Sequence, residues 1–182
     1  TKLLKIDSKT AKIENKKESE EIVSSLKMGK AKVLDIEKKK IFSSPPPPFT
    51  TSTLQQRAPN YLGYSSKRTM QLAQGLYEKG LITYHRTDSL FLSKEALSSM
   101  RGFITKTYGK EYLPEKIRFF KTKSKVAQEA HEAIRPTNIL KTPETTKLKY
   151  AQEGKLYKLI YKRALCSQME KASFDKTKIK VL

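Results

Sequence analysis

The sequence is poor in the residues that build disulfides and zinc sites. It has a single cysteine and two histidines, so an internal disulfide is excluded and a four-ligand structural zinc site is out of reach. The cysteine, Cys166, lies within an apolar helical pattern, and we expect it to be a buried small hydrophobic residue.

Long hydrophobic runs are also absent. No stretch approaches the roughly 20 apolar residues that a membrane-spanning helix needs. Residues 1–8 show no basic region followed by an apolar run, so we expect no signal peptide. With 37% hydrophobic and 31% charged residues, the composition is typical of a soluble globular protein that can bury a core. We therefore expect a cytoplasmic protein with no membrane partner.

Acidic residues are few. The chain has 18 Asp and Glu against 38 Lys and Arg, a formal net charge of +20. This excess predicts a polyanionic partner, with nucleic acid the first candidate, and salt-sensitive binding. A lysine-rich, solvated surface produces the same total. Tyr61 and Tyr64 precede Lys67 and Arg68, and such interleaving suits stacking of single-stranded bases beside phosphate contacts.

Both ends of the chain carry strand patterns. Residues 31–41 have the pattern of a lysine-rich strand. Near the C-terminus Thr177, Ile179 and Val181 alternate with lysines, which predicts a half-buried strand. Pairing this last strand with the early ones makes residues 45–172 an excursion between two parts of one small sheet.

Four consecutive prolines, residues 45–48, begin that excursion. They remove four backbone donors and hold the chain near polyproline II, so we expect a stiff connector. A second interpretation is a proline-rich adaptor, in which residues 45–49 bind the aromatic groove of a proline-reading domain.

Beyond the prolines the pattern is helical, with capping residues, apolar stripes and terminal glycines or prolines. The expected elements are a helix over 52–58 ended by Pro59, a helix capped by Ser66 and closed by Gly80, a helix capped by Ser93, and a helical stretch from Thr142 interrupted near Gly154. The sequence thus predicts an α+β fold. A mainly helical insertion with helix-turn-helix-like units, residues 45–172, is carried on small β-rich segments, residues 1–44 and 173–182.

Residues 80–89 (GLITYHRTDS) place a tyrosine beside a cation, an imidazole and a carboxylate. A phenol with a pKa of about 10 is a weak nucleophile at neutral pH, so a catalytic tyrosine needs neighbours that stabilise phenolate or neutralise the attacked group. The fork of Arg86 matches phosphate oxygens, and Asp88 could hold that fork in place. This set predicts attack by Tyr84 on phosphate. The alternative is that Tyr84 packs in a strand with its hydroxyl hydrogen-bonded.

Residues 128–137 (QEAHEAIRPT) predict one short polar helix that ends before Pro136. In such a helix His131 and Arg135 share a face, and His131 could protonate a leaving oxygen or support a phosphate. A zinc-protease helix is excluded, because position 135 lacks the second histidine. The alternative is a solvated helix with a lone histidine.

Together these segments resemble the bacterial DNA topoisomerase I family, of type IA, in both order and spacing. The segments that carry the resemblance are 45–56, 66–70, 80–89 and 130–137. The resemblance covers about Leu3 to Leu182, and residues 156–181 resemble the return of the family's helical domain into its β-rich arch. One departure is the stretch 57–60, where the family usually continues a helix with small or acidic residues.

The resemblance implies that Tyr84 cuts one DNA strand, forming a 5′-phosphotyrosine link. The free 3′-hydroxyl reseals the strand without ATP, and negative supercoils are relaxed. Arg86 would stabilise charge on the phosphate, His131 would contact phosphate or assist proton movement, and Asp88 would orient its neighbours. The residues expected to contact DNA are Lys67, Arg68, Thr83 and Arg135. The helical insertion would swing on the arch as a gate.

The resemblance also implies an acidic, magnesium-binding Toprim domain, whereas this chain contains no Asp-x-Asp pair. We therefore expect no metal ligands here, and Mg²⁺ would bind in a Toprim domain elsewhere in the same enzyme. The chain is then interpreted as a central fragment whose partners are single-stranded DNA and the remaining domains of that enzyme.

Two other functions stay open. In a non-catalytic module for single-stranded nucleic acid, Tyr84 would stack on a base. A tyrosine recombinase or type IB nicking enzyme would need a larger set of Arg, His and Lys around its tyrosine, and it would join the opposite DNA end.

Overall fold

A computed structural model describes residues 3–6, 9–120 and 131–181 of the chain. The chain divides into two compact units: unit 1 comprises residues 1–41 and 175–182, and unit 2 comprises residues 42–174. No helix in the described part of the chain is long and apolar enough to cross a membrane.

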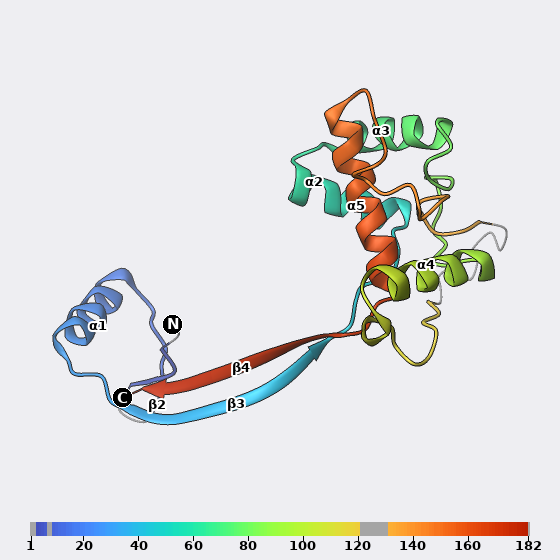
Figure 1. Ribbon diagram of the computed structural model, residues 1–182. Helices are drawn as coiled ribbons and strands as arrows, with labels where there is room; N and C mark the ends of the chain where they lie inside the picture. The colour runs from blue at the N-terminus through green and yellow to red at the C-terminus, as the bar shows by residue number, and fades with distance from the viewer. Residues whose placement is uncertain (1–2, 7–8, 121–130, 182) are drawn as a thin grey trace. The chain divides into compact units, whose positions relative to one another are not determined.

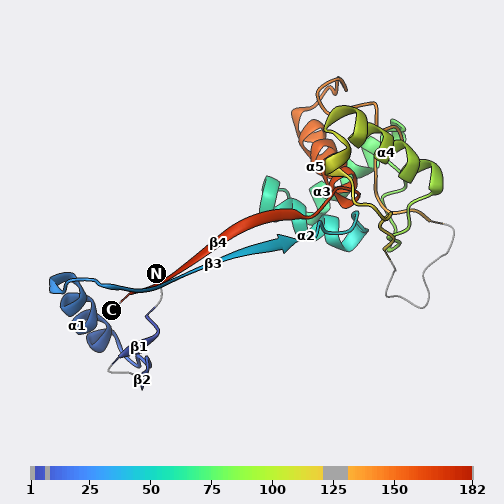
Figure 2. The same ribbon diagram turned by 60° about the horizontal axis from the view of Figure 1, so that its bottom comes forward.

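The described residues of unit 1 include one helix and most of two small two-stranded sheets (Figures 1 and 2). β1, Lys5–Ile6, pairs antiparallel with β2, Lys9–Thr10. α1, Lys16–Met28, follows. β3, Val33–Ser43, pairs with β4, Ala172–Val181, and their arrows run in opposite directions (Figure 1). The predicted pairing of the last strand with an early strand is confirmed.

The predicted half-burial of that last strand is wrong. Every residue of β4 is exposed, with Ile179 and Val181 exposed by 54% and 53%. β3 and β4 form a two-stranded ribbon, and no further layer of described residues buries either face of it. The alternation of apolar residues and lysines therefore marks an extended backbone here, without marking a buried side.

Unit 2 is mainly helical, which confirms the predicted α+β fold with a helical insertion (Figure 1). Its helices are α2, Thr51–Leu62; α3, Ser66–Glu78; α4, Lys94–Thr107; the short 3-10 helix η1, Lys110–Tyr112; and α5, Ala151–Ser167. α3 packs against α2 and α5, and α2 also contacts α5. Their shared core includes the fully buried side chains of Leu54, Leu76, Leu156 and Ile160.

Side-chain caps set the starts of these helices. Thr50 forms a capping box with Thr53 at α2, and Ser93 caps α4 as predicted. α3 is capped by Ser65 instead of the predicted Ser66. Ser65 has the extended backbone of a capping residue, with φ −60° and ψ 157°, whereas Ser66 is already helical.

The predicted end of the first of these helices at Pro59 is also wrong. α2 continues through Pro59 to Leu62 and ends at Gly63, whose φ of 71° is left-handed. A proline inside a helix removes one hydrogen bond and costs about 3 kcal/mol. Ala58 is fully buried and Leu62 packs against the core, so burial on this turn offsets the cost.

The helical stretch predicted from Thr142 begins later in the chain. Residues 142–150 form turns and bends, and α5 follows them and runs through Gly154 without interruption. Cys166, predicted to be buried, is exposed. The buried face of α5 passes through its neighbour Leu165 instead.

Two glycines give a matched test of these helix boundaries. A Cβ added at Gly154 would meet no atom within 4 Å, so Gly154→Ala should raise the free energy of unfolding by about 0.5–1 kcal/mol, because glycine loses more backbone entropy in a helix. Gly63→Ala should lower it by about 1 kcal/mol, because alanine is strained in the left-handed region. Urea unfolding measures both changes. Destabilisation by Gly154→Ala would contradict a continuous α5.

Candidate active site

The segment that carries Tyr84 emerges from the end of α3 and runs beside a second extended segment. Ile82 forms an antiparallel bridge with Pro136. The N–H of Thr83 donates to the carbonyl oxygen of Arg135 at 2.9 Å. These bonds fix the backbone immediately before Tyr84.

A third segment, at the start of α2, completes the support. The N–H of Ile134 donates to the carbonyl oxygen of Phe49 at 2.8 Å. The N–H of Thr51 donates to the carbonyl oxygen of Thr87 at 2.8 Å, and the Thr51 hydroxyl accepts from the N–H of Thr87 at 2.9 Å. The same hydroxyl donates to the carbonyl oxygen of His85 at 2.8 Å. We call segments 49–51, 82–87 and 134–136 the frame, because together they fix the backbone on both sides of Tyr84.

The polar helix predicted around His131 is wrong for the described residues. Residues 128–130 lie outside the described part of the chain, and residues 131–135 form no helix. The N–H of Ile134 donates to a distant segment at 2.8 Å, so a tertiary partner takes a donor that a helix would use internally. His131 and Arg135 therefore do not share a helical face.

Residues 80–89, which we call the tyrosine motif, alternate in exposure from Tyr84 to Ser89. An extended chain points successive side chains to opposite sides, so every second residue can be buried. The exposed residues are Tyr84, Arg86 and Asp88, and the buried residues are His85, Thr87 and Ser89. The motif thus presents its phenol, guanidinium and carboxylate to solvent and packs the intervening side chains inside.

The ring of Tyr84 lies among other rings. Its centroid is 5.3 Å from that of Tyr77, 5.4 Å from that of His85 and 5.6 Å from that of His131, each in an edge-on arrangement. Tyr84 is still 38% exposed, and its hydroxyl makes no hydrogen bond to any described residue. This setting disfavours the interpretation of Tyr84 as a packed strand residue with a satisfied hydroxyl.

His85 is a buried and neutral member of the motif. Its side chain is fully buried, and neither ring nitrogen has a hydrogen-bond partner among the described residues. Burial lowers the pKa of His85 below its usual value, and the charge of neighbouring Arg86 lowers it further. His85 thus packs against Tyr84 as an uncharged ring.

Arg86 and Asp88 are not joined to each other. Both are exposed, and neither forms an ion pair within the described part of the chain. The predicted use of Asp88 to hold the guanidinium of Arg86 is not seen in this structure. Arg86 therefore has no counter-charge from the described residues, and its fork can bind an external anion.

Arg135 and Thr83, both expected to contact DNA, are engaged with the protein. The guanidinium of Arg135 pairs with the carboxylate of Glu132 and donates to the carbonyl oxygen of Pro136 at 2.8 Å. Glu132 also accepts a hydrogen bond from the N–H of Ser93 at 2.6 Å. The hydroxyl of Thr83 accepts from the N–H of Arg135 at 3.0 Å. These groups thus brace the frame and the start of α4.

Lys67 and Arg68 lie at the start of α3 and are exposed. The Nε of Arg68 donates to the side-chain oxygen of Gln152 at 3.1 Å. Among the described residues, no hydrogen bond, ion pair or ring contact links Lys67 or Arg68 to Tyr84. The structure thus gathers Tyr84, Arg86 and His131 in one region and does not join these two cations to it.

Sequence reasoning missed two residues of the site, Tyr77 and Thr51. The helical repeat puts Tyr77 beside the buried Leu76, yet Tyr77 is 41% exposed and its ring contacts Tyr84. Thr51 looks like any polar residue at a helix start. Its partners lie 34 and 36 residues away, so no local signal could have marked it.

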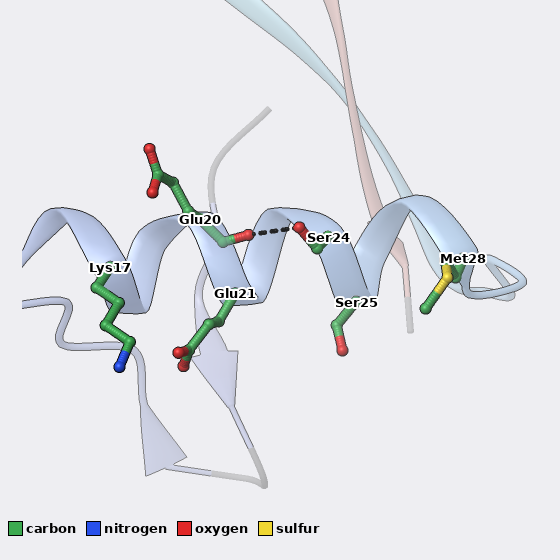
Figure 3. A pocket seen from close by; sticks show the side chains of 6 residues that line it. All are labelled: Lys17, Glu20, Glu21, Ser24, Ser25 and Met28. Carbon is green, nitrogen blue, oxygen red and sulfur yellow. Dashed lines mark hydrogen bonds between the residues drawn. The ribbon is translucent and has the colours of Figure 1, made fainter.

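The described residues offer no metal site. Among them, no group of three or more His, Cys, Asp and Glu side chains could hold a metal ion. A shallow hollow occurs on α1 of unit 1 (Figure 3). It is lined by Lys17, Glu20, Glu21, Ser24, Ser25 and Met28. All six come from one helix, and none is a predicted site residue.

Comparison with known proteins gives consistent matches. The family described as DNA topoisomerase matches residues 2–182. The chain is 48% identical over 170 residues to DNA topoisomerase 1 of Rickettsia prowazekii (strain Madrid E). The aligned region covers 88% of this chain and 22% of that relative. It is 50% identical over 169 residues to the Campylobacter jejuni protein of that name, covering 88% and 24%, and 47% identical over 183 residues to that of Helicobacter pylori (strain ATCC 700392 / 26695), covering 95% and 25%.

A solved structure shares the fold. Full-length topoisomerase I from Thermotoga maritima superposes with a TM-score of 0.73 at 35% identity, covering 96% of this chain and 28% of that chain. The chain thus spans between 22% and 25% of the length of these three curated relatives.

The buried state of His85 generates a prediction on pH. Its pKa is lowered from 6.5 in the folded protein, so below that value the unfolded chain takes up more protons than the folded one. The neutral His85 therefore contributes fully to the stability of the folded protein above the pKa of the unfolded chain. This contribution is lost as the pH falls towards the lower pKa of the folded protein. Lowering the pH from about 7.5 to about 5.5 should therefore cost the native protein more free energy of unfolding than it costs His85→Leu. Thermal unfolding at both pH values measures the difference, and equal losses would contradict it.

Proposed function

This chain belongs to the DNA topoisomerase family, and on that premise we propose that Tyr84 is the strand-cutting nucleophile of a type IA topoisomerase. The setting of Tyr84 carries the proposal. Its backbone is fixed on both sides by the frame, the residue is 38% exposed, and its hydroxyl has no partner among the described residues. A nucleophile needs this combination of a fixed position and an available oxygen.

In the proposed reaction the phenol oxygen of Tyr84 attacks the phosphorus of a phosphodiester in single-stranded DNA. The bond from phosphorus to the 3′ oxygen breaks, the phenol proton is removed, and the leaving oxygen gains a proton. The new 5′ end is held as phosphotyrosine. Attack by the freed 3′-hydroxyl reverses each step, so resealing consumes no ATP and repeated cycles relax negative supercoils.

Arg86, His131 and Asp88 are the proposed catalytic partners. Arg86 is exposed and lacks a protein counter-charge within the described part of the chain, so its guanidinium can bind the attacked phosphate and balance the charge that develops there. The ring of His131 lies beside that of Tyr84, where it can contact the phosphate or move a proton. Asp88, on the exposed side of the same segment, would orient groups around the bound phosphate.

Lys67 and Arg68 are proposed to contact DNA phosphates, and their exposure at the start of α3 supports this role. Thr83 and Arg135 are proposed to contact DNA as well. Because both now bond protein groups, a direct DNA contact would have to replace or share those bonds.

The proposal places the chain inside a larger enzyme. Residues 1–44 and 173–182 would belong to an arch, and residues 45–172 would form the domain that swings on it. The Mg²⁺ of the complete enzyme would be held by a Toprim domain of the same protein, as the resemblance to the type IA family implies. The proposed partners are single-stranded DNA and those other domains, and the proposed compartment is the cytoplasm.

A second function deserves a test because Tyr84 is both exposed and aromatic. An exposed ring beside an arginine can stack on a base in a non-catalytic module for single-stranded nucleic acid. Stacking needs the ring alone, whereas strand cutting needs the hydroxyl.

Replacing Tyr84 by phenylalanine separates these functions. In the full-length protein Tyr84→Phe should reduce covalent protein–DNA adduct to background while changing the Kd for oligonucleotide less than about twofold, because only the nucleophilic oxygen is lost. Denaturing gels of trapped reactions with end-labelled DNA measure the adduct and show that protein is joined to the 5′ end. Tyr108→Phe, at an exposed tyrosine outside the site, is the control and should keep full adduct. Persistent adduct in Tyr84→Phe would refute the proposal.

The 182-residue chain on its own should relax supercoiled plasmid at a rate indistinguishable from buffer. Its described residues hold no cluster fit for the metal ion, and the other domains of the proposed enzyme would be missing. Gel electrophoresis of plasmid topoisomers after incubation with Mg²⁺ measures relaxation. Efficient relaxation by this chain alone would overturn the assignment of the Toprim domain's role.

A further inference from the structure

Two arginines of unit 2 rest on aromatic rings. The guanidinium carbon of Arg57, on α2, lies 5.2 Å from the ring centroid of Tyr61. That of Arg163, on α5, lies 4.4 Å from the ring centroid of Phe49. Both are cation–π contacts, which orient a guanidinium without neutralising its charge.

Neither arginine has an anionic partner in the described part of the chain. Four other arginines are bonded to protein groups: Arg68 to Gln152, Arg101 to Pro114, Arg118 to Glu170 and Arg135 to Glu132. Arg57, Arg163 and the active-site residue Arg86 make no hydrogen bond or ion pair with any described residue. Arginines with unused donor forks are the residues that bind phosphate most effectively.

Arg57 and Arg163 lie on helices α2 and α5, which pack against each other, and their charges interact. Burial lowers the pKa of Arg163 below its usual value, and the positive charge of Arg57 lowers it further. Arg163 is half-buried, whereas Arg57 is exposed. Their like charges repel each other, and an anion bound to both would relieve that repulsion.

The ring under Arg163 is firmly held. Phe49 is fully buried, and its carbonyl oxygen accepts the frame hydrogen bond from Ile134 at 2.8 Å. Tyr61, under Arg57, is 62% exposed. A fixed ring limits the rotamers of Arg163 before any ligand arrives, which lowers the entropy cost of binding. The exposed ring of Tyr61 adds a surface on which a base can stack.

We propose that Arg57 and Arg163 form a second phosphate-binding site, separate from that of Arg86, which binds a phosphodiester of single-stranded DNA. This site deepens the proposed function and rests on it for the identity of the ligand. Each guanidinium donates to phosphate oxygens, and the base next to that phosphate stacks on Tyr61.

The competing explanation is that both arginines serve packing alone. A cation–π contact can stabilise an arginine with no ligand present. That explanation predicts a loss of thermal stability on substitution and no specific effect on the salt dependence of DNA binding. A phosphate site predicts a change in the salt dependence itself, because each phosphate that is neutralised releases counterions.

The test uses the full-length protein and a fluorescein-labelled oligo(dT), with Kd measured by fluorescence anisotropy over a salt series. Arg57→Gln/Arg163→Gln should weaken binding about tenfold and reduce the slope of log K against log[salt] by at least ~0.7, the value for one phosphate of a single strand. The matched control is Lys106→Gln/Lys110→Gln, which removes the same charge from two exposed lysines near the end of α4. It should change Kd by less than about twofold.

If the arginine and lysine double variants change the salt slope and the Kd equally, the proposed site is contradicted. Only the loss of net charge would then matter. If Arg163→Gln fails to fold, Arg57→Gln and Arg163→Lys replace the double variant. Arg163→Lys keeps the charge and loses the fork, so it should weaken binding at low salt, and unchanged affinity in both replacements would also overturn the site.

A second readout separates this proposal from the one on Tyr84. At saturating DNA the double arginine variant should still form covalent adduct, whereas Tyr84→Phe should not. Adduct in Tyr84→Phe defeats the proposed nucleophile, whatever the arginine variants do. Loss of adduct in Tyr84→Phe with an unaltered salt slope in the arginine variant defeats only the second phosphate site.

Discussion

The site depends on hydrogen bonds between three short segments that are far apart in the sequence. Thr51 bonds both backbone groups of Thr87, and Ile134 bonds Phe49 in the same frame. None of these segments belongs to a long strand, so few other backbone bonds hold them. Their donors and acceptors are partly or fully buried, and an unpaired group there is costly. The requirement to pair them selects one arrangement of the chain around Tyr84 and gives the nucleophile its fixed position.

Once the frame is formed, its extended backbone distributes the polar groups. The two-residue period exposes Tyr84 and Arg86 and buries His85 between them. A buried ring with no hydrogen-bond partner in the described part of the chain is tolerated because it stays neutral. The arginines of the site also differ in their role. Arg135 is paired with a carboxylate and supports the frame, whereas Arg86 has no protein counter-charge among the described residues and remains available to a phosphate.

Local signals predicted most of the helical framework. Ser93 was recognisable as a cap, and the apolar pattern indicated a helix over most of α3. The errors occurred where packing outweighs local preference. Pro59 lies inside α2 because the turn around it is buried, and residues 131–135 are not helical because distant carbonyls take their donors. Within the site, the exposed residues of the tyrosine motif could be named in advance, but Thr51 and Tyr77 could not, since their contacts join segments that are not neighbours in sequence.

The sequence by itself determined the chemistry that is available: a tyrosine, an arginine and an aspartate at alternate positions, a histidine-bearing segment farther along, and a charge of +20 that favours a polyanion. These are properties of residue type and spacing, which do not require a fold. Only the tertiary structure decided that His131 reaches Tyr84, that Arg135 is paired with Glu132, and that Arg57 and Arg163 lie on packed helices without a counter-charge among the described residues. Such pairings depend on which buried backbone groups and helix faces find partners, and that is settled by the packing of the whole unit.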